Sequence, residues 1–157
     1  MNTTNITIVK DEEGFAPIIK KWTDAVEGLR VATAADWKTK PMSVEHHYII
    51  STEIPVPAYA MDRIRQGHIP EGMDDRWFMY CENDVIRYFR SWLGANIFNA
   101  YFEQRGDDFC IYRIDVDTED FSSSPNEAAD ALKMFIQLLF HQCDVHEKEC
   151  PINIVND

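Results

Sequence analysis

Basic residues are scarce in this sequence. Its 157 residues include 15 lysines and arginines against 27 aspartates and glutamates, which gives a formal net charge of -12. Such a chain lacks the positive field that nonspecific binding to nucleic acid or to an anionic membrane requires, so we expect neither partner. The acidity suits a basic protein partner, because complementary charge speeds encounter and selects partners. It is equally consistent with a role in solubility alone.

Long apolar runs and an export signal are also lacking. No apolar run approaches the roughly 20 residues that a helix needs to cross a bilayer. The first residues, MNTTNITIVKDEEG, do not combine a basic segment with a following apolar one, as a secretory signal does. The four cysteines have no disulfide-framework spacing, so we interpret them as reduced thiols. These features predict a cytoplasmic protein, and the length predicts one domain over residues 1–157.

Familiar catalytic and metal-binding motifs are missing as well. There is no G-x-S-x-G elbow, no phosphate-binding glycine loop and no H-E-x-x-H. The acidic segment DVDTED lacks the glycine and the glutamate that an EF-hand loop requires. Cys143, His146 and Cys150 are zinc-ligand types, but they lack paired knuckle spacing. We expect no metal and no cofactor. The absences favour a non-enzyme, although active sites are also assembled from residues far apart in sequence.

Four apolar runs separated by short turn clusters predict an antiparallel meander. The runs are RWFMYCE, VIRYFRSW, IFNAYFEQ and FCIYRIDVD, with the turns ND, LGAN and RGDD between them. Two further strands are expected upstream, NITIVK and VEHHYIIST. Pro55 and Pro57 disfavour a central strand where they stand.

Helical spacing of apolar residues predicts three helices. The first runs from Phe15 to about Val31, and a short one runs from Ala58 to Gln66, where Gly67 ends it. The third spans about Pro125 to Gln142, after a capping box of Ser124 and Glu127. The expected fold is therefore a single α+β domain. In it, an antiparallel β-meander of four or more strands packs against a C-terminal helix and an N-terminal helix.

The run VIRYFRSW contains two arginines, and an arginine covered in a sheet needs a carboxylate, a phosphate or an aromatic plane. Alternation along the strand places Arg87 and Arg90 on opposite faces. In one interpretation, an anion such as a nucleotide binds to Arg90, Trp92, Tyr88 and Trp77. In the structural interpretation, the arginines pair across strands with Glu103, Asp115 or Glu82.

The segment from Gly67 to Glu103 contains DRWF and RSWLG. It resembles a group of uncharacterised bacterial proteins that have an aromatic strand after a DRWF-like start and an RSWTG-like strand end. The matching positions are Asp75, Arg76, Trp77, Phe78, Arg90, Ser91, Trp92 and Gly94. Leu93 stands where that group has threonine, and Phe89 where it has histidine, which argues against histidine-based chemistry on this strand. The resemblance covers about a quarter of the chain, supports the meander and implies no activity.

Small size, strong acidity and missing motifs favour a binding or inhibitor protein, such as a bacterial immunity protein that neutralises a basic toxin. The expected partner-binding residues are Asp107, Asp108, Asp117, Glu119 and Asp120. The alternative is a small-molecule binder or enzyme that uses the arginine and tryptophan surface of the meander. His68 with Asp62 or Glu71 offers acid–base groups, but such trios arise by chance in any chain of this size. The partner, the ligand and the oligomeric state are left open.

Overall fold

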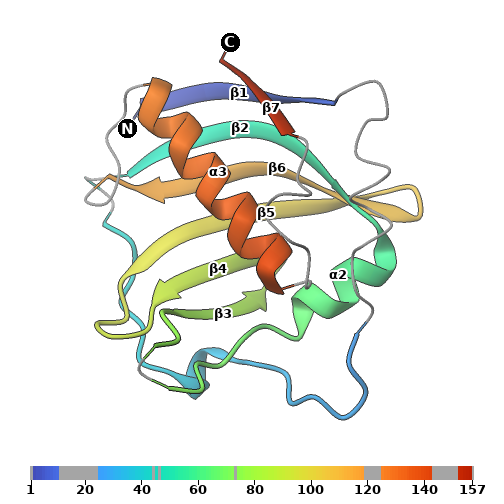
Figure 1. Ribbon diagram of the computed structural model, residues 1–157, viewed down its shortest axis with the longest axis vertical. Coiled ribbons are helices and arrows are strands. Elements are labelled where there is room, and N and C mark those ends of the chain that lie inside the picture. Colours follow the sequence, from blue (N-terminus) through green and yellow to red (C-terminus); the bar gives the residue numbers. More distant parts are fainter. Residues whose placement is uncertain are drawn as a thin grey trace.

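The computed structural model describes residues 2–10, 25–43, 45, 47–72, 74–118, 125–142 and 152–156. Its elements are β1 (Asn2–Lys10), the short 3-10 helix η1 (Ala34–Asp36), β2 (His47–Val56), α2 (Ala58–Arg65), β3 (Trp77–Glu82), β4 (Val85–Arg90), β5 (Asn96–Arg105), β6 (Asp108–Asp117), α3 (Pro125–Gln142) and β7 (Ile152–Asn156). The strands form one sheet in the order β3-β4-β5-β6-β2-β1-β7 (Figure 1). The five strands from β3 to β2 are antiparallel, which confirms the α+β class and the meander.

The tight turn between β3 and β4 follows directly from its sequence. Asn83 and Asp84 have φ angles of 52° and 60°. A two-residue hairpin loop with both residues at positive φ is a type I′ turn, whose twist matches that of the flanking strands. Asparagine and aspartate tolerate this conformation better than most residues, so the ND pair fixes both the position and the register of the hairpin.

Helix α3 crosses one face of the sheet, and α2 lies beside one end of the same face (Figure 1). The side chains of α3 that point to the sheet are at most 2% exposed: Ala128, Ala131, Leu132, Phe135, Ile136 and Leu139. Phe135 meets Tyr88 of β4 and Phe98 of β5 edge to face, with ring centroids 5.8 Å apart in both pairs. The predicted apolar stripe of this helix is therefore confirmed, and Cys143 lies outside the described residues.

A second, smaller apolar cluster lies on the opposite face of the sheet. Ala32, Phe78, Tyr80 and Phe89 are buried there, with Trp37 and Ile69 packed against them. The rings of Tyr80 and Phe89 stack 5.6 Å apart at an interplanar angle of 4°. The irregular segment 32–42 thus covers the β3–β4 end of this face and leaves the rest of it to polar side chains.

The predicted helix over residues 15–31 is wrong in its described part. Residues 25–31 contain a turn and no helix, and residues 11–24 lie outside the described part of the chain. The Gln66 side chain pairs with both backbone groups of Val26, accepting from its N–H and donating to its carbonyl at 2.9 Å. Gly28 has a φ of 78°, outside the helical region. Val26 and Leu29 are 48% and 41% exposed, so no apolar helix face is buried here.

Strand β2 passes through Pro55, although proline was expected to disfavour a central strand. Pro55 pairs with Cys110 of β6, beyond a register shift between Ser51 and Ile54. Strand β1 pairs with β2 only from Tyr48 to Ser51. At Pro55 the other side of β2 therefore has no strand partner among the described residues, and the missing N–H costs no ladder bond. Among the residues that the structure describes, no helix is long and apolar enough to span a membrane.

Candidate functional site

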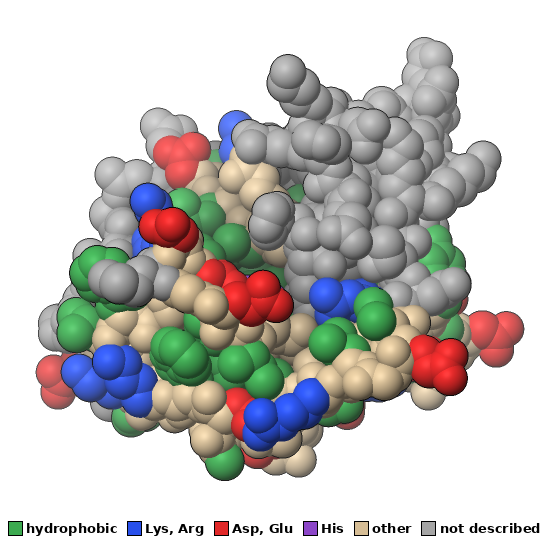
Figure 2. Space-filling view, turned by 60° about the horizontal axis from the view of Figure 1, so that its bottom comes forward, with side chains coloured by type: hydrophobic (Ala, Val, Ile, Leu, Met, Phe, Trp, Pro, Cys, Tyr) green, Lys and Arg blue, Asp and Glu red, His purple; other side chains and the backbone are tan. Residues whose placement is uncertain are grey.

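The clearest surface feature of the meander is the corner after β4, which we call the Arg–Trp corner. A hollow of about 410 Å³ is lined there by Asp74, Arg76, Arg90, Ser91 and Trp92. Trp92 and Leu93 are 63% and 68% exposed, the largest values among the exposed hydrophobic side chains described. Figure 2, turned so that the β3 side comes forward, shows basic, acidic and hydrophobic side chains interspersed on that face.

The backbone holds this corner in place. The Trp37 indole N–H donates to the Ser91 carbonyl at 2.7 Å, and the Ser91 N–H donates to the Arg76 carbonyl at 2.9 Å. Gly94 has a φ of 76°, and a Cβ there would lie 2.6 Å from the Lys38 carbonyl oxygen. Only glycine fits both constraints, so the close approach of the segment around Lys38 fixes the turn that presents Trp92.

The structure separates the four predicted ligand residues. Arg90 and Trp92 line the Arg–Trp corner, but Tyr88 is 3% exposed and belongs to the core under α3. Trp77 packs on Tyr88 and Phe98, with centroid distances of 6.0 and 6.1 Å. Tyr88 therefore lies in the core and does not line the corner. The strand ends at Arg90, so the alternation of side chains along β4 does not extend to Trp92.

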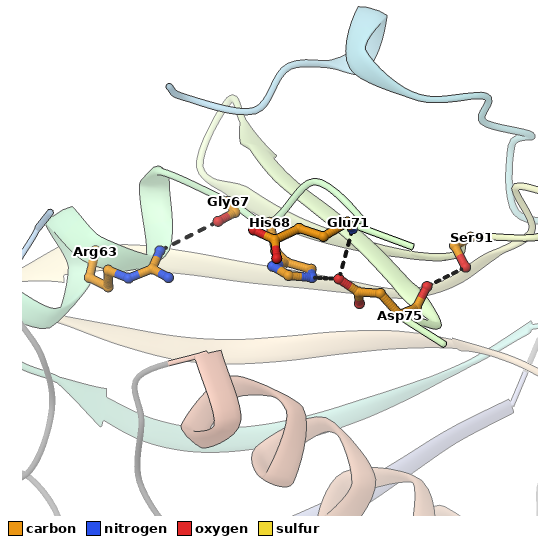
Figure 3. A network of polar contacts seen from close by, with 6 residues as sticks. All are labelled: Arg63, Gly67, His68, Glu71, Asp75 and Ser91. Carbon is orange, nitrogen blue, oxygen red and sulfur yellow. Dashed lines mark hydrogen bonds and ion pairs between the residues drawn. The ribbon is translucent and has the colours of Figure 1, made fainter. Parts of the chain in front are cut away.

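A chain of polar contacts behind the corner superficially resembles a catalytic triad (Figure 3). The His68 Nε2 lies 2.6 Å from Oδ2 of Asp75, and the Ser91 hydroxyl donates to the backbone carbonyl of Asp75 at 2.8 Å. A nucleophilic triad requires the histidine to contact the serine, but here aspartate stands between them. The Glu71 N–H also donates to Oδ2 of Asp75. The network therefore holds the 68–76 loop against β4, and the partner of His68 is Asp75, not Asp62 or Glu71.

Arg87 lies on the other face of the sheet, as alternation predicted. It lines a second hollow, which also contains Glu82 and Asp115, two of the acids expected to pair with it. Neither forms an ion pair with it, and among the described residues Arg87 has no carboxylate within ion-pair distance. Asp115 pairs instead with Arg113, whose Nε donates to Oδ1 at 2.8 Å.

The predicted acidic partner residues do not form one surface. Asp107 and Asp108 lie at the β5–β6 turn, whereas Asp117 ends β6, roughly 30 Å away for a strand that rises about 3.3 Å per residue. Asp117 is 7% exposed, so little of its side chain is open to a partner in this structure. Asp108 also has a structural role, because its Oδ1 accepts from the Ala58 N–H at the start of α2. Glu119 and Asp120 lie outside the described residues.

The exposed carboxylates instead gather at the end of the sheet that carries the β3–β4 and β5–β6 turns. We call this surface the acidic end; its members are Glu53, Glu82, Asp84, Glu103 and Asp107, all exposed. The Phe102 N–H donates to the Asp84 carbonyl at 3.1 Å, which ties one turn to the strand of the other. Arg105 of β5 reaches Glu103 of the same strand at 2.9 Å and Glu53 of β2 at 3.3 Å, so two strands contribute to one surface.

The two described thiols have the properties of core cysteines. Burial raises the pKa of the Cys81 thiol to about 12, despite the opposing charge of Arg65, and its S–H faces the Ile64 carbonyl at 3.5 Å. Burial also raises the pKa of Cys110. A nucleophilic cysteine needs a lowered pKa, so neither thiol suits covalent catalysis. Over the described ranges, no three histidine, cysteine or acidic side chains are grouped as metal ligands.

No family model, no curated protein and no solved structure matches the chain.

Proposed function

We propose that this chain is an acidic cytoplasmic binding protein that inhibits a basic protein partner, as a bacterial immunity protein neutralises a basic toxin. The observation that carries the proposal is the acidic end, which has five exposed carboxylates and in which Arg105 pairs with two of them. Their charge is only partly compensated, because Arg105 alone contacts Glu53 and Glu103. Such a surface attracts a positively charged partner and sets its orientation before contact.

Capture of a partner from cells of the source organism tests this function. The tagged chain is expected to retain a basic protein at low salt and to release it as the salt concentration rises, because exposed charges are screened. A triple variant, Glu53→Lys, Glu103→Lys and Asp107→Lys, should lower the association rate at least tenfold, as charge reversal opposes steering. Asp108 is left intact because it caps α2.

A matched control separates local from total charge. Glu27, Glu45 and Glu71 are exposed and lie outside the acidic end. Their replacement by lysine changes the net charge by the same amount and should leave most of the association rate. If both triple variants lose binding equally, only total charge matters and the acidic end is not the contact surface. Retention of no basic protein by the native chain also contradicts the proposal.

The Arg–Trp corner supports a second candidate function, the binding of an anion with an aromatic body, such as a nucleotide. The observation in its favour is that Arg76 and Arg90 line one hollow with the exposed Trp92, and neither arginine has an ion-pair partner in the described part of the chain. ATP is the suitable probe, because its base can stack on indole while its phosphates meet guanidinium groups. Thermal stabilisation by ATP that disappears in Arg76→Ala would support this function, and no stabilisation of the native chain would reject it.

A further inference from the structure

The hollow that contains Arg87 lies on the sheet face opposite α3; it shares no residue with the Arg–Trp corner and only Glu82 with the acidic end. Its volume is about 440 Å³, within the range of small-molecule sites. Segment 39–42 forms one wall, and β2 to β6 form the floor. Its main polar lining residues are Lys40, His47, Tyr80, Arg87, Asn99 and Asp115. We call it the polar hollow.

Asn99 is the residue of the polar hollow that most needs an explanation. It stands in the middle of β5, is 6% exposed, and its Oδ1 is buried without a hydrogen-bond partner. An unsatisfied buried acceptor destabilises the folded protein. The neighbouring Asn96 differs, since its Nδ2 donates to the carbonyls of Tyr88 and Phe98. Asn96 therefore supports the irregular β4–β5 pairing, whereas the carbonyl group of Asn99 is left for another donor.

The strand register places positive charge beside this carbonyl. Arg87 is directly opposite Asn99 on β4, and Tyr80 is directly opposite Arg87 on β3. Arg87 is half-buried and unpaired within the described residues, although a covered guanidinium favours an anionic partner. Burial raises the pKa of Tyr80, so its phenol stays protonated and can donate. Lys40 adds a second cation, held at the rim by its N–H bond to the Gly94 carbonyl at 2.8 Å.

The hollow also contains two carboxylates, those of Asp115 and Glu82. Asp115 is already compensated by Arg113, with contacts of 2.8 and 3.2 Å, and the Tyr101 hydroxyl donates to its Oδ2. Glu82 is exposed at the end of β3. His47 has one nitrogen engaged, since its Nδ1 lies 2.9 Å from the Ser43 carbonyl. A carbonyl only accepts, so Nδ1 carries the proton and Nε2 remains available for a ligand.

From this arrangement we infer that the polar hollow binds a small organic anion that also carries a hydrogen-bond donor. The carboxylate or phosphate of the ligand pairs with Arg87 and Lys40. Its N–H or O–H group donates to Oδ1 of Asn99 once this side chain turns toward the hollow, because the atom is buried in the free protein. Tyr80 donates to the same anionic group. The ring of Phe89 and the side chains of Pro41 and Met42 contact the apolar part of the ligand. The unsatisfied carbonyl and the unpaired guanidinium are thus both satisfied by one bound molecule.

Thermal unfolding with four probes tests the inference. AMP, citrate and L-glutamate each combine an anionic group with a donor, and acetate has the anionic group alone. At millimolar concentration, at least one of the first three is expected to raise the melting temperature by about 4 °C, and acetate by much less. AMP as the strongest probe assigns a phosphate ligand, and citrate or glutamate a carboxylate. If none of the three raises the melting temperature, or if acetate equals them, the inference is wrong.

Two variants of the hollow locate the site. Arg87→Met should remove the thermal shift. Asn99→Leu should also remove it, and should raise the melting temperature of the ligand-free protein, because leucine has a similar volume and leaves no unsatisfied acceptor. A structural asparagine would instead lower that temperature when replaced. A lowered value, or a shift that persists in both variants, overturns the assignment.

Controls on the other surfaces keep the three sites apart. Arg90→Met and the triple lysine variant of the acidic end should both retain the full shift, because neither residue set lines the polar hollow. Loss of the shift in Arg90→Met, with retention in Arg87→Met, would assign the anion to the Arg–Trp corner. Capture of the protein partner is measured on the native chain without added anion. A failed capture together with a thermal shift by the anion would contradict the proposed function and leave this inference standing.

Discussion

The guanidinium of Arg90 lies over the indole ring of Trp77, with its Cζ 4.3 Å from the ring centroid. The two residues are directly opposite in the β3–β4 register, so the contact is a cross-strand pair. No carboxylate in the described part of the chain forms an ion pair with Arg90. The arginine that looked costly within a strand is therefore compensated by an aromatic face, the least expected of the three possible partners in so acidic a chain.

The Arg90–Trp77 contact predicts a measurable contribution to stability. Arg90→Ala should lower the free energy of unfolding by about 1 kcal/mol, the usual size of a partly exposed cation–π contact. Urea unfolding measures this change. Arg76→Ala is the matched control, because Arg76 is exposed on the same corner and contacts no described ring; its effect should stay within about 0.5 kcal/mol. Equal losses in the two variants would show that the ring contact contributes nothing specific.

Two glycines at positive φ predict different costs for the same substitution. Gly106 has a φ of 66° and open space where a Cβ would stand, so Gly106→Ala tests the backbone conformation alone and should cost about 1–2 kcal/mol. Gly67 has a φ of 73°, but a Cβ there would lie 2.5 Å from the Met79 carbonyl oxygen and 2.7 Å from the Ala32 Cβ. Gly67→Ala should therefore cost about 3 kcal/mol or more. Chemical denaturation measures the free energy of unfolding of both variants. Similar losses in the two would mean that the chain around Ala32 relaxes freely.

The carboxylate of Asp75 predicts the stability of the loop before β3. It accepts from the Glu71 N–H at 3.2 Å and contacts Nε2 of His68 at 2.6 Å. Asp75→Ala should cost about 1–2 kcal/mol, because both contacts are lost together. Asp74→Ala changes the neighbouring, exposed carboxylate and should have little effect. Hydrogen exchange of the 68–76 amides gives a second measurement, and unchanged protection in Asp75→Ala would contradict the role assigned to this network.

Local patterns made much of the fold predictable. The ND pair between two apolar runs determines a hairpin, and the helical spacing of Leu132, Phe135 and Leu139 determines the buried side of α3. Both depend on contacts close in sequence. The helix prediction is wrong over residues 25–31 for the opposite reason. Gln66, which is distant in sequence, forms hydrogen bonds with both backbone groups of Val26. No local periodicity reports such a competitor.

The candidate sites were less predictable, because they depend on tertiary neighbours. Alternation correctly placed Arg87 and Arg90 on opposite faces, but it could not show that Trp77 would take the partner position beside Arg90. The polar hollow was missed, although one signal existed. An asparagine between apolar residues in IFNAYFE is a polar group where the pattern predicts burial. Segment 39–42, which completes the hollow, has no periodicity that would bring it to this face.

The Cys81 thiol predicts how stability depends on alkaline pH. Its pKa is raised from the ordinary 9.0 to about 12, because burial disfavours the thiolate. Below pH 9 the thiol is neutral in the folded and unfolded chains, so its full contribution to stability is present. As the pH rises from 9 toward 12, the unfolded chain ionises first and this contribution is lost, with a slope approaching about 1.4 kcal/mol per pH unit. The measurement is the difference in unfolding free energy between the native chain and Cys81→Ala, which cancels the other titrating groups. It should be constant up to pH 9 and fall above it, whereas a difference that rises with pH would require a thiolate stabilised by Arg65 in the folded protein.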